Sequence, residues 1–563
     1  MPRIVSVVLD HLGFFNIHAG GLAVHGANLV VSAQLHEIAR RPEVEGFEIF
    51  LAPYAMTDPG LLRQSAEGLM PADRMGRGIL RFYPMHAMPD IWRDGEARLM
   101  YTVDPENLPR DRYLRDRFAE GPTPIVSTAH ALGHAALWPK LQRLAEAPPV
   151  SYDAIVAPSR SYAAALEKAF DGYLGATAQC RIEVIPHGID GDRFRPVDEA
   201  GRTAARRELE LPEGATIALV FGRLTPNNKA DLSPLLRVFA EVSQPEDRLV
   251  LAGEENIAGY LDRLAAEASE LGIGDRVTVR GRVDPDRRER YFQASDLFVF
   301  PGDTLEAFAT TVTEALACGL PCIVSDWAGL RDQVVDGDNG FCVPTWFVPG
   351  LDRVGQLSPA NLTHTEFLYL AQSVWVDTRG LGESLATLLR STEDRQRMGQ
   401  RSRAIFDERF RLEHVFDRLF ALFDEMIELA RREGDESKAE RRSHADKLGL
   451  PTPYISIFGA YATHVLNGEV RVRPTKHGNQ VLRKQASLTF YDECLPLLRP
   501  DIFGALLERL GALNPITEPD MSFGSLVSGA SFASNAAEDD VRFHAALLLK
   551  RGVMELVPIP AKG

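Results

Sequence analysis

Cysteine is scarce in this sequence, and the few copies form no recognisable set. The 563 residues contain five cysteines, at positions 180, 318, 322, 342 and 494. An odd number of scattered cysteines does not suit a disulfide framework, so we expect reduced thiols. Cys318 and Cys322 have the spacing of a metal pair, but no second pair accompanies them, and we interpret them as packing residues around a helix end.

Long apolar runs are also missing. No stretch reaches the roughly 20 residues that span a membrane, and Pro2-Arg3-Ile4 enters a strand without the apolar segment of a signal peptide. Positive charge is outnumbered, with 62 Lys and Arg against 78 Asp and Glu and a formal net charge of -16. This balance argues against nucleic acid or an anionic membrane as the main partner. We therefore expect a soluble, cytoplasmic protein without a membrane span.

Two nucleotide-binding motifs are absent. No G-x-G-x-x-G follows the first strand and no P-loop is present, so binding of a dinucleotide or of ATP has little support. D-x-D occurs at 190–192 and at 336–338, but both copies lie in turn-rich contexts, and turn chemistry explains them better than a metal site. We expect no metal and no cofactor.

What the sequence has in quantity is an alternation of short apolar runs with helix-patterned segments. The runs in the first 200 residues are 4–9, 47–51, 79–83, 125–127, 154–157 and 182–185, and the helical segments include 26–40, 135–146 and 162–170. A second series follows the proline-bounded connector 186–196, with runs at 217–221, 249–252, 277–279, 297–300, 322–325 and 341–343. Such alternation indicates parallel sheets with helices on both faces, and two doubly wound units place a ligand cleft between them.

The alternation sets the expected domains. We expect an N-terminal domain at 1–200, a second domain at 201–432 that ends in strongly helical sequence from 383, a linker at 433–449 and an extension at 450–563. The polar stretch at 433–447 can also be a solvated helix end. The extension begins with strand-like runs at 454–462 and 469–473 and continues with helices at 496–510 and 541–550. It carries no motif tied to chemistry. Acceptor recognition, oligomerisation or contact with a protein partner, and packing on the rest of the chain all remain open for it.

The stretch PGDTLEAFATTVTEALACG at 301–319 is the strongest candidate for a site. It joins a buried strand to a helix that stops at Gly319, and the two carboxylates Glu306 and Glu314 bracket the turn. A helix N-terminus suits phosphate, while carboxylates suit hydroxyls, and a nucleotide-sugar supplies both. The alternative is an ordinary turn with two surface glutamates.

A basic loop follows the strand at 217–221. Gly222 allows close backbone approach, and Arg223 and Lys229 lie at the carboxyl end of the strand, where open α/β sheets bind ligands. Two cations there can hold a diphosphate. Solvated surface residues are the alternative.

Together these segments resemble the retaining glycosyltransferases of glycosyltransferase family 4, which have the GT-B fold. The G-R-x(n)-K pattern at Gly222, Arg223 and Lys229 and the Glu-x7-Glu pattern at Glu306 and Glu314 carry the likeness. Further matches in the same order are Gly20-Gly21, His130 in STAHALG, APSRSY at 157–162 and IPHGIDGDRF at 185–194. The resemblance spans about 4–432 and implies an α/β chain of GT-B architecture, with two Rossmann-like domains facing a cleft plus a smaller C-terminal α+β extension. TAHALG is also similar to the sucrose-phosphate synthase subgroup, over too short a stretch to fix a substrate.

The resemblance also implies roles for individual residues. Arg223 and Lys229 would neutralise the donor diphosphate, Glu306 would bind hydroxyls of the donor sugar, and Glu314 would bind the ribose. The other implied contacts come from backbone N–H groups of Phe308, Ala309 and Thr310, the loop of Gly20 and Gly21, and His130, which would face the sugar. Ala309 and Ala230 replace glycines that are usual in the family, which puts fine specificity in doubt more than activity.

The function implied by the resemblance is transfer of a sugar from a nucleotide-diphosphate sugar, with retention and without metal. UDP-sugars are favoured, GDP- or ADP-sugars are possible, and the acceptor can be a small molecule, a glycan, a peptide or a protein. Two alternatives are a nucleotide-sugar epimerase on the same fold and a non-catalytic scaffold that binds nucleotide-sugar.

Overall fold

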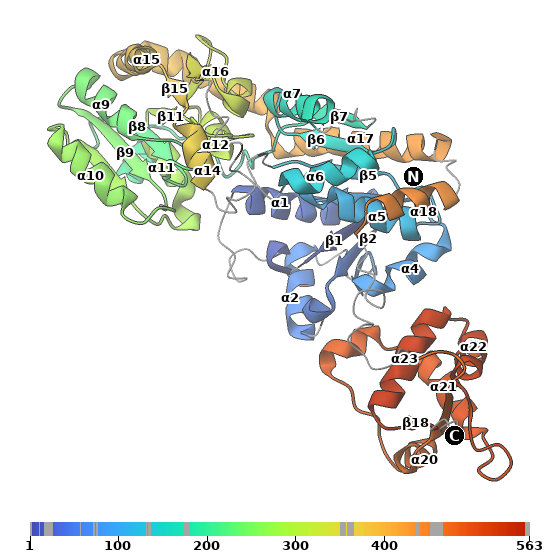
Figure 1. Cartoon of the computed structure of the whole chain (residues 1–563). Helices are drawn as coiled ribbons and strands as arrows, with labels where there is room; N and C mark the ends of the chain where they lie inside the picture. The colour runs from blue at the N-terminus through green and yellow to red at the C-terminus, as the bar shows by residue number, and fades with distance from the viewer. Residues whose placement is uncertain are drawn as a thin grey trace. The chain divides into compact units, whose positions relative to one another are not determined.

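A computed structural model shows how the chain is arranged (Figure 1). It describes residues 3–10, 12–15, 26–56, 58–70, 74, 77–130, 132, 137–173, 180–348, 356, 365–433, 438–450 and 466–557. The chain divides into two compact units. The second unit collects 51–62, 83–88 and 450–563, and the first holds the remainder up to Gly449. Across the described segments, no helix is long and apolar enough to cross a membrane.

The N-terminal half of the first unit is built on a sheet that has seven strands within the described residues. The strand order is β3-β2-β1-β4-β5-β6-β7, and β1, β4, β5, β6 and β7 pair in parallel. The strands are β1 (Arg3–Leu9), β2 (Val44–Leu51), β3 (Leu80–Pro84), β4 (Arg98–Thr102), β5 (Ile125–Thr128), β6 (Ala154–Ala157) and β7 (Arg181–Val184). The main helices between them are α1 (Gly26–Arg40), α2 (Pro59–Leu69), α5 (Leu108–Phe118), α6 (Leu137–Glu146) and α7 (Arg160–Lys168).

A second sheet forms the centre of the following half. Its described strands run in the order β10-β9-β8-β11-β12-β13, all in parallel. They are β8 (Thr216–Phe221), β9 (Asp247–Ala252), β10 (Val277–Arg280), β11 (Leu297–Phe300), β12 (Cys322–Ser325) and β13 (Gly340–Val343). The helices are α8 (Glu199–Glu208), α9 (Ser233–Val242), α10 (Tyr260–Glu270), α11 (Arg288–Ala294), α12 (Thr310–Ala317), α15 (Thr378–Arg390) and α16 (Thr392–Arg409).

Both faces of this second sheet are buried because successive side chains of a strand point to opposite sides. In β8, Leu219 lies in one apolar cluster, with α8, α11, α12 and α16. Its neighbour Val220 lies in the other cluster, with α9, α10 and α15. Such strands read as continuous apolar runs, which explains why all six were predicted correctly from the sequence. The strand order reverses beside β8, between β9 and β11, and a doubly wound sheet binds its ligand at that point.

Two elements connect the halves of the first unit. Helix α17 (Leu412–Glu433) continues from the second half and packs on the first, with Phe423 beside Tyr101 of β4 and Asp417 bonded to Arg41 at 2.7 Å. The connector after β7 pairs with the same region, because Ile189 exchanges backbone hydrogen bonds with Phe410 and Leu412. Figure 1 shows α17 and α18 (Lys438–Lys447) in orange beside the blue and cyan N-terminal half.

A short ribbon interrupts the second half between β13 and α15. Strands β14 (Thr345–Phe347) and β15 (Val374–Val376) pair in antiparallel fashion, and α14 (Thr365–Ala371) precedes β15. The sequence did not predict this ribbon. It carries the exposed aromatic residues Trp346, Phe347 and Trp375.

The second unit has its own core. Helices α20 (Lys476–Leu482), α21 (Pro500–Gly511), α22 (Phe523–Ser534) and α23 (Glu538–Lys550) pack around the strands β16 (Arg471–Pro474), β17 (Met521–Ser522) and β18 (Met554–Leu556). Helix and strand thus both occur in the extension, as predicted. The strand expected at 469–473 and the helices expected at 496–510 and 541–550 correspond to β16, α21 and α23, whereas the strand expected at 454–462 lies outside the described residues.

One central strand escaped the sequence analysis. β4 lies next to β1, yet it begins with an arginine, which hides its apolar character. Arg98 is buried and is neutralised by Glu48 of β2 at 3.0 Å and by Asp94 at 2.7 Å. Burial of a charge is tolerated only with such partners, and these partners are distant in sequence or in a turn. Helix α18 occupies most of the stretch 433–449 and packs on α5.

Candidate active site

Two glycines open the carboxyl edge of the second sheet. Gly222 follows β8 with a φ of 132°, and Gly253 follows β9 with a φ of 146°. A Cβ atom on Gly253 would lie 1.5 Å from the carbonyl oxygen of Gly222, so only glycine fits there. This close approach shapes the backbone from which Arg223 projects.

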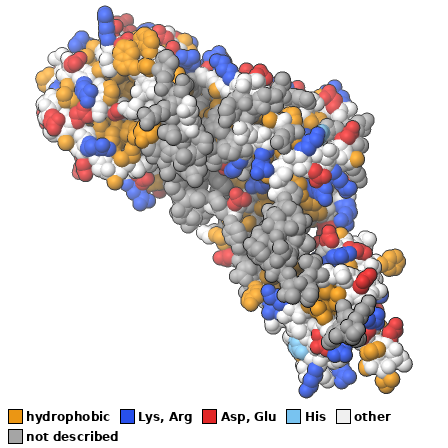
Figure 2. Space-filling view, in the orientation of Figure 1, with side chains coloured by type: hydrophobic (Ala, Val, Ile, Leu, Met, Phe, Trp, Pro, Cys, Tyr) orange, Lys and Arg blue, Asp and Glu red, His pale blue; other side chains and the backbone are white. Residues whose placement is uncertain are grey.

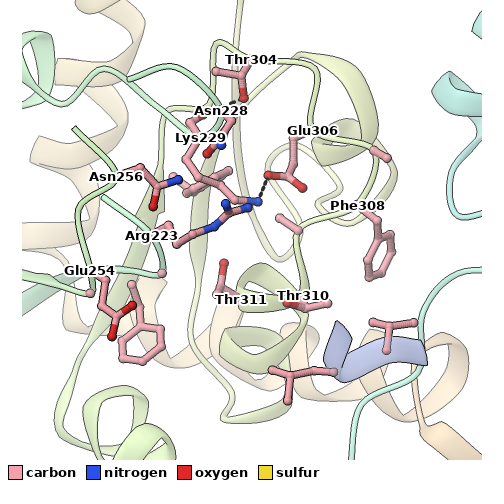
Figure 3. Close-up of a pocket in the computed structure, with 18 of the residues that line it drawn as sticks. Arg223, Asn228, Lys229, Glu254, Asn256, Thr304, Glu306, Phe308, Thr310 and Thr311 are labelled. Carbon is pink, nitrogen blue, oxygen red and sulfur yellow. Dashed lines mark hydrogen bonds and ion pairs between the residues drawn. The ribbon is translucent and has the colours of Figure 1, made fainter. Parts of the chain in front are cut away.

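A cavity of about 620 Å³ lies at this edge. Its walls come from the loops after β8, β9 and β11, from α1 and α14, and from His130 and His187. Figure 3 shows the side chains of Arg223, Lys229 and Glu306 meeting in its centre, with Thr310 and Thr311 below them. Both halves of the first unit therefore contribute to one cavity at the strand-order reversal.

Arg223 and Lys229 bring two cations to the same point. Lys229 Nζ donates a hydrogen bond to Glu306 Oε2. Arg223 makes no hydrogen bond or ion pair with any residue that the structure describes, and burial lowers the pKa of its guanidinium. A partly buried charge without a hydrogen-bonded partner is costly, and the nearby Glu306 carboxylate offsets only part of that cost. The cavity therefore presents a positive charge that a bound anion would neutralise.

Hydrogen bonds fix the backbone of the loop that carries Glu306. The Trp327 indole donates to the carbonyl oxygen of Thr304 at 2.7 Å, and Thr304 Oγ1 donates to the carbonyl oxygen of Lys229 at 3.1 Å. Gly329 N–H donates to the carbonyl oxygen of Glu306 at 2.9 Å. These bonds fix the backbone of the loop against both the basic loop and the segment after β12.

Helix α12 points its first turn at the cavity. The side chain of Gln333 accepts from Ala309 N–H at 3.2 Å and donates to the Ala309 carbonyl at 2.8 Å, which fixes the start of the helix. Phe308, Ala309 and Thr310 all line the cavity. Because its N–H is already bonded to Gln333, Ala309 is a poorer donor to a ligand than the sequence analysis supposed, while the first turn of a helix leaves other N–H groups without intrahelical partners.

Glu314 lies behind this wall. Both of its carboxylate oxygens accept from Arg288 Nη2, at 2.6 and 2.8 Å, and Glu314 itself is not among the residues that line the cavity. Burial raises the pKa of the Glu314 carboxyl, and Arg288 opposes that shift. To bind ribose hydroxyls as predicted, the Glu314 carboxylate would have to divide its hydrogen bonds between the ribose and Arg288. The Arg288 guanidinium also lies 5.5 Å from the centre of the Phe221 ring.

His130 enters the cavity as one of a stacked pair. Its ring centroid lies 5.3 Å from that of His187, whose edge contacts Phe308 at 5.3 Å. Burial lowers the pKa of His130 to about 4, and burial together with the neighbouring His130 lowers the pKa of His187 further below its usual range. Both imidazoles are neutral at pH 7. Neither ring nitrogen of His130 makes a hydrogen bond of ordinary geometry to a described residue.

Two further sets of residues were considered from the sequence. Gly20 and Gly21 lie outside the described residues. The two D-x-D sequences make structural bonds: Asp190 accepts from the backbone N–H groups of Asp192 and Arg193, and Asp338 pairs with Arg401 at 2.9 Å. Among the residues that the structure describes, no group of three or more His, Cys, Asp or Glu side chains is arranged to hold a metal ion.

Four residues of this site were not predicted from the sequence. Gly253 repeats the signal that identified Gly222, a glycine directly after a buried strand, and could have been found. His187 stands in the connector motif that was noted without a role. Arg288 and Gln333 gave no signal, because their importance comes from partners 26 and 24 residues away.

Comparisons with known proteins agree with this geometry. The sequence model of the family "Glycosyl transferases group 1" matches residues 201–346. A D-inositol 3-phosphate glycosyltransferase of Mycolicibacterium smegmatis is 31% identical over 413 residues, which cover 67% of this chain and 89% of that protein. The enzyme of the same name from Segniliparus rotundus is 34% identical over 177 residues, covering 31% of this chain and 38% of its own length.

Solved structures share the fold. The crystal structure of HepE from Anabaena in complex with UDP aligns with a TM-score of 0.54 at 15% identity, covering 75% of this chain and all of that one. The sucrose-phosphate synthase of Thermosynechococcus elongatus aligns with a TM-score of 0.51 at 18% identity, covering 76% of this chain and all of that one. At such identities the likeness bears on architecture, and it matches the expected pair of Rossmann-like domains.

Proposed function

The chain belongs to the glycosyl transferases group 1 family and is a glycosyltransferase; on that premise we propose that it transfers a sugar from a nucleotide-diphosphate sugar, with retention of configuration, in the cavity between the two halves of its first unit. The proposed reaction uses neither a metal nor a cofactor, and the nucleotide-sugar is a substrate.

The observation that carries the proposal is the unpaired guanidinium of Arg223 inside the cavity, beside Lys229 and the first turn of α12. A diphosphate bears the negative charge that such a group lacks. Arg223 can hold it by a forked contact and Lys229 as a point charge. Glu306 then exchanges Lys229 for hydroxyl groups of the donor sugar, which lie next to the diphosphate in the same molecule.

The same cations serve the chemical step. The bond between the anomeric carbon and the distal phosphate oxygen breaks, and a bond from an acceptor oxygen to that carbon forms on the same face. The acceptor proton passes to the departing phosphate oxygen. Negative charge grows on the diphosphate as it leaves, so preorganised cations stabilise the transition state more than the ground state.

His130 fits a neutral role in this scheme. Because burial keeps its pKa near 4, its imidazole can accept or donate one hydrogen bond but carries no charge at pH 7. A neutral ring beside the sugar can bond a hydroxyl without repelling the positive charge that develops at the anomeric centre. We assign the loop of Gly20 and Gly21 to the phosphates and acceptor on the family resemblance.

The base of the donor is the next question. The Anabaena structure contains UDP, which makes UDP-sugars the first donors to test. The curated relatives are named for a phosphorylated inositol, so D-inositol 3-phosphate is the first small acceptor to test. GDP- and ADP-sugars serve as the matched alternatives.

The experiment is a thermal-shift screen followed by product analysis. Wild-type protein should be stabilised by one class among UDP-, GDP- and ADP-sugars, and incubation of that donor with acceptor should yield a glycoside of the same anomeric configuration. Glu306→Ala should lose transfer, whereas Arg237→Ala, which removes a solvent-exposed arginine of α9, should not. Absence of any shift, or conversion of donor to an epimer without acceptor, would contradict the proposal.

A further inference from the structure

The ribbon of β14 and β15 exposes an aromatic surface, which we define as Trp346, Phe347 and Trp375. Their exposed fractions are 51%, 50% and 49%. Large apolar side chains that stay half exposed on a folded protein often mark a binding surface. Figure 2 shows hydrophobic side chains gathered on the surface where Figure 1 places α15 and β15.

The two tryptophans form a fixed pair. Trp346 and Trp375 stand directly opposite each other across the ribbon, with ring centroids 4.9 Å apart and planes at 37°. Cross-strand aromatic pairs stabilise each other in position. Neither indole N–H has a hydrogen-bond acceptor in the part of the chain that the structure describes. The pair thus offers a broad apolar face together with two unused donors.

Trp327 is a neighbouring tryptophan with a structural role, since its indole N–H has an acceptor. Its indole donates to the Thr304 carbonyl at 2.7 Å, and its ring lies 5.7 Å from that of Phe347. Thr304 lines the donor cavity, as does Leu370 of the preceding helix α14. The aromatic surface is therefore connected to the wall of the cavity through Trp327, which contacts Phe347 and bonds Thr304.

Charges beside the surface are paired with one another. Arg331 bonds Asp326 at 3.0 Å after β12, and Arg379 bonds Glu383 at 2.9 Å at the start of α15. A surface with compensated charges selects a neutral ligand more readily than an ionic one. The residues that match the family model end at Trp346, so most of the ribbon lies beyond the matched segment.

We propose that Trp346, Phe347 and Trp375 bind a neutral glycan, a part of the acceptor that lies outside the cavity while its terminal residue enters it. A pyranose ring has an apolar face of C–H groups and a rim of hydroxyls. Aromatic faces cover the former, and indole N–H groups bond the latter. The inference rests on the proposed function, because it extends the acceptors of that reaction from small molecules such as D-inositol 3-phosphate to an oligosaccharide or a glycan-bearing molecule.

A membrane surface is the other occupant with matching chemistry. The net charge of -16 opposes approach to anionic lipids, and the described charges beside the ribbon supply no unpaired basic cluster. The two tryptophans also pack against each other, and each residue is only about half exposed. Such a pair suits a flat binding surface better than insertion of a side chain into a membrane.

The test uses the full chain on a glycan array. Wild-type protein should bind a subset of neutral glycans, and a double variant with Trp346→Ala and Trp375→Ala should bind them about tenfold more weakly, a loss of about 1.4 kcal/mol. Phe532→Ala, which removes a residue with 92% exposure from the second unit, should leave binding unchanged. Trp346→Tyr should retain most of the binding, because a ring remains.

A second measurement separates this inference from the proposed function. The nucleotide or nucleotide-sugar that stabilises wild type in the thermal-shift screen should stabilise the double variant equally. Wild-type protein that binds no glycan, or a double variant that binds as wild type, would overturn the aromatic site while leaving the donor site intact. Loss of sedimentation with phosphatidylcholine vesicles, without loss of glycan binding, would assign the surface to a membrane instead. Failure of every nucleotide-sugar to shift wild type would count against the proposed function.

Discussion

The two halves of the first unit are built on the same architecture but are stabilised differently. In the second half, alternate residues of six predicted strands fill two apolar clusters on the two faces of the sheet. The first half buries a connected cluster of charged residues, whereas the second half holds separate pairs such as Arg206 with Asp296 and Arg288 with Glu314. Arg112 and Arg115 of α5 pair with Asp116 at 2.6 Å, and Arg115 pairs with Asp153 at 2.8 Å, all nearly inaccessible to solvent.

The difference explains which site residues can be predicted from the sequence. On the donor side, Arg223, Lys229 and Glu306 lie in the loops that follow the buried strands β8 and β11, so the apolar runs of those strands locate them in the sequence. On the other side, order depends on ion pairs between distant residues, and the apolar pattern is interrupted. The comparison predicts that replacing a polar residue lowers stability when the residue lies in the first half, and weakens ligand binding when it lies in the site of the second half.

The largest effect should come from the buried ion cluster. Asp153→Ala removes one of the two carboxylates that pair with the buried Arg115, and it also removes an acceptor for the N–H groups of Ile125 and Val150. Loss of one partner of a buried pair costs about 3–5 kcal/mol. Urea denaturation should show this drop in the free energy of unfolding. A variant within 1 kcal/mol of wild type would mean that the cluster is dispensable.

On the donor side, Lys229→Ala should lower kcat by about 10²–10³-fold while the fold stays intact. Lys229 is partly exposed, and its removal leaves Glu306 facing the cavity, where water can solvate it. Steady-state kinetics with the donor found in the screen measure the loss, and circular dichroism checks the fold. Turnover equal to wild type would remove Lys229 from the site.

A pair of glycines tests whether the carboxyl edge is shaped by close approach. Gly253→Ala adds strain and a methyl group 1.5 Å from the Gly222 carbonyl, whereas Gly259→Ala adds strain alone, since nothing lies near its Cβ position. We expect about 1–3 kcal/mol of destabilisation from strain in either variant. Only Gly253→Ala should also weaken UDP binding measured by calorimetry. Equal UDP affinities for both variants would contradict the assigned role of that contact.

The smallest effect concerns pH. The pKa of His130 is about 4 in the folded protein and 6.5 in the absence of burial. Between pH 4 and pH 6.5, His130 is protonated in the unfolded chain but neutral in the folded protein. The contribution of neutral His130 to the free energy of unfolding is therefore complete above pH 6.5 and is lost as the pH falls toward 4. It amounts to about 2 kcal/mol between pH 7 and pH 5. His130→Phe should therefore lose less stability than wild type over that interval, by urea denaturation at both pH values.

The match between sequence and structure follows the same division. All six strands of the second sheet, the helix after β11 and the convergence of Arg223, Lys229 and Glu306 were predictable, because strand-end positions meet at one sheet edge. β4 was not, since Arg98 interrupts its apolar pattern and is neutralised through Glu48, 50 residues away. Nor was the Arg288 partner of Glu314. Spacing indicates which residues leave a strand end, but not which partner a carboxylate meets across a helix interface.

The aromatic ribbon marks a further limit. Trp346 and Trp375 are separated by 29 positions, and only the antiparallel pairing of two three-residue strands brings their rings together. Strands of three residues are too short to be predicted from a periodic pattern of apolar residues. The pair therefore became visible only in three dimensions.

The central claim is that Arg223 holds the diphosphate of the donor. Calorimetric titration of wild type and Arg223→Ala with UDP and with uridine tests it most directly, because the two ligands differ only in the diphosphate. The account predicts at least a tenfold loss of UDP affinity in the variant, about 1.4 kcal/mol, with uridine affinity unchanged. An equal loss for both ligands, or none for UDP, would contradict it.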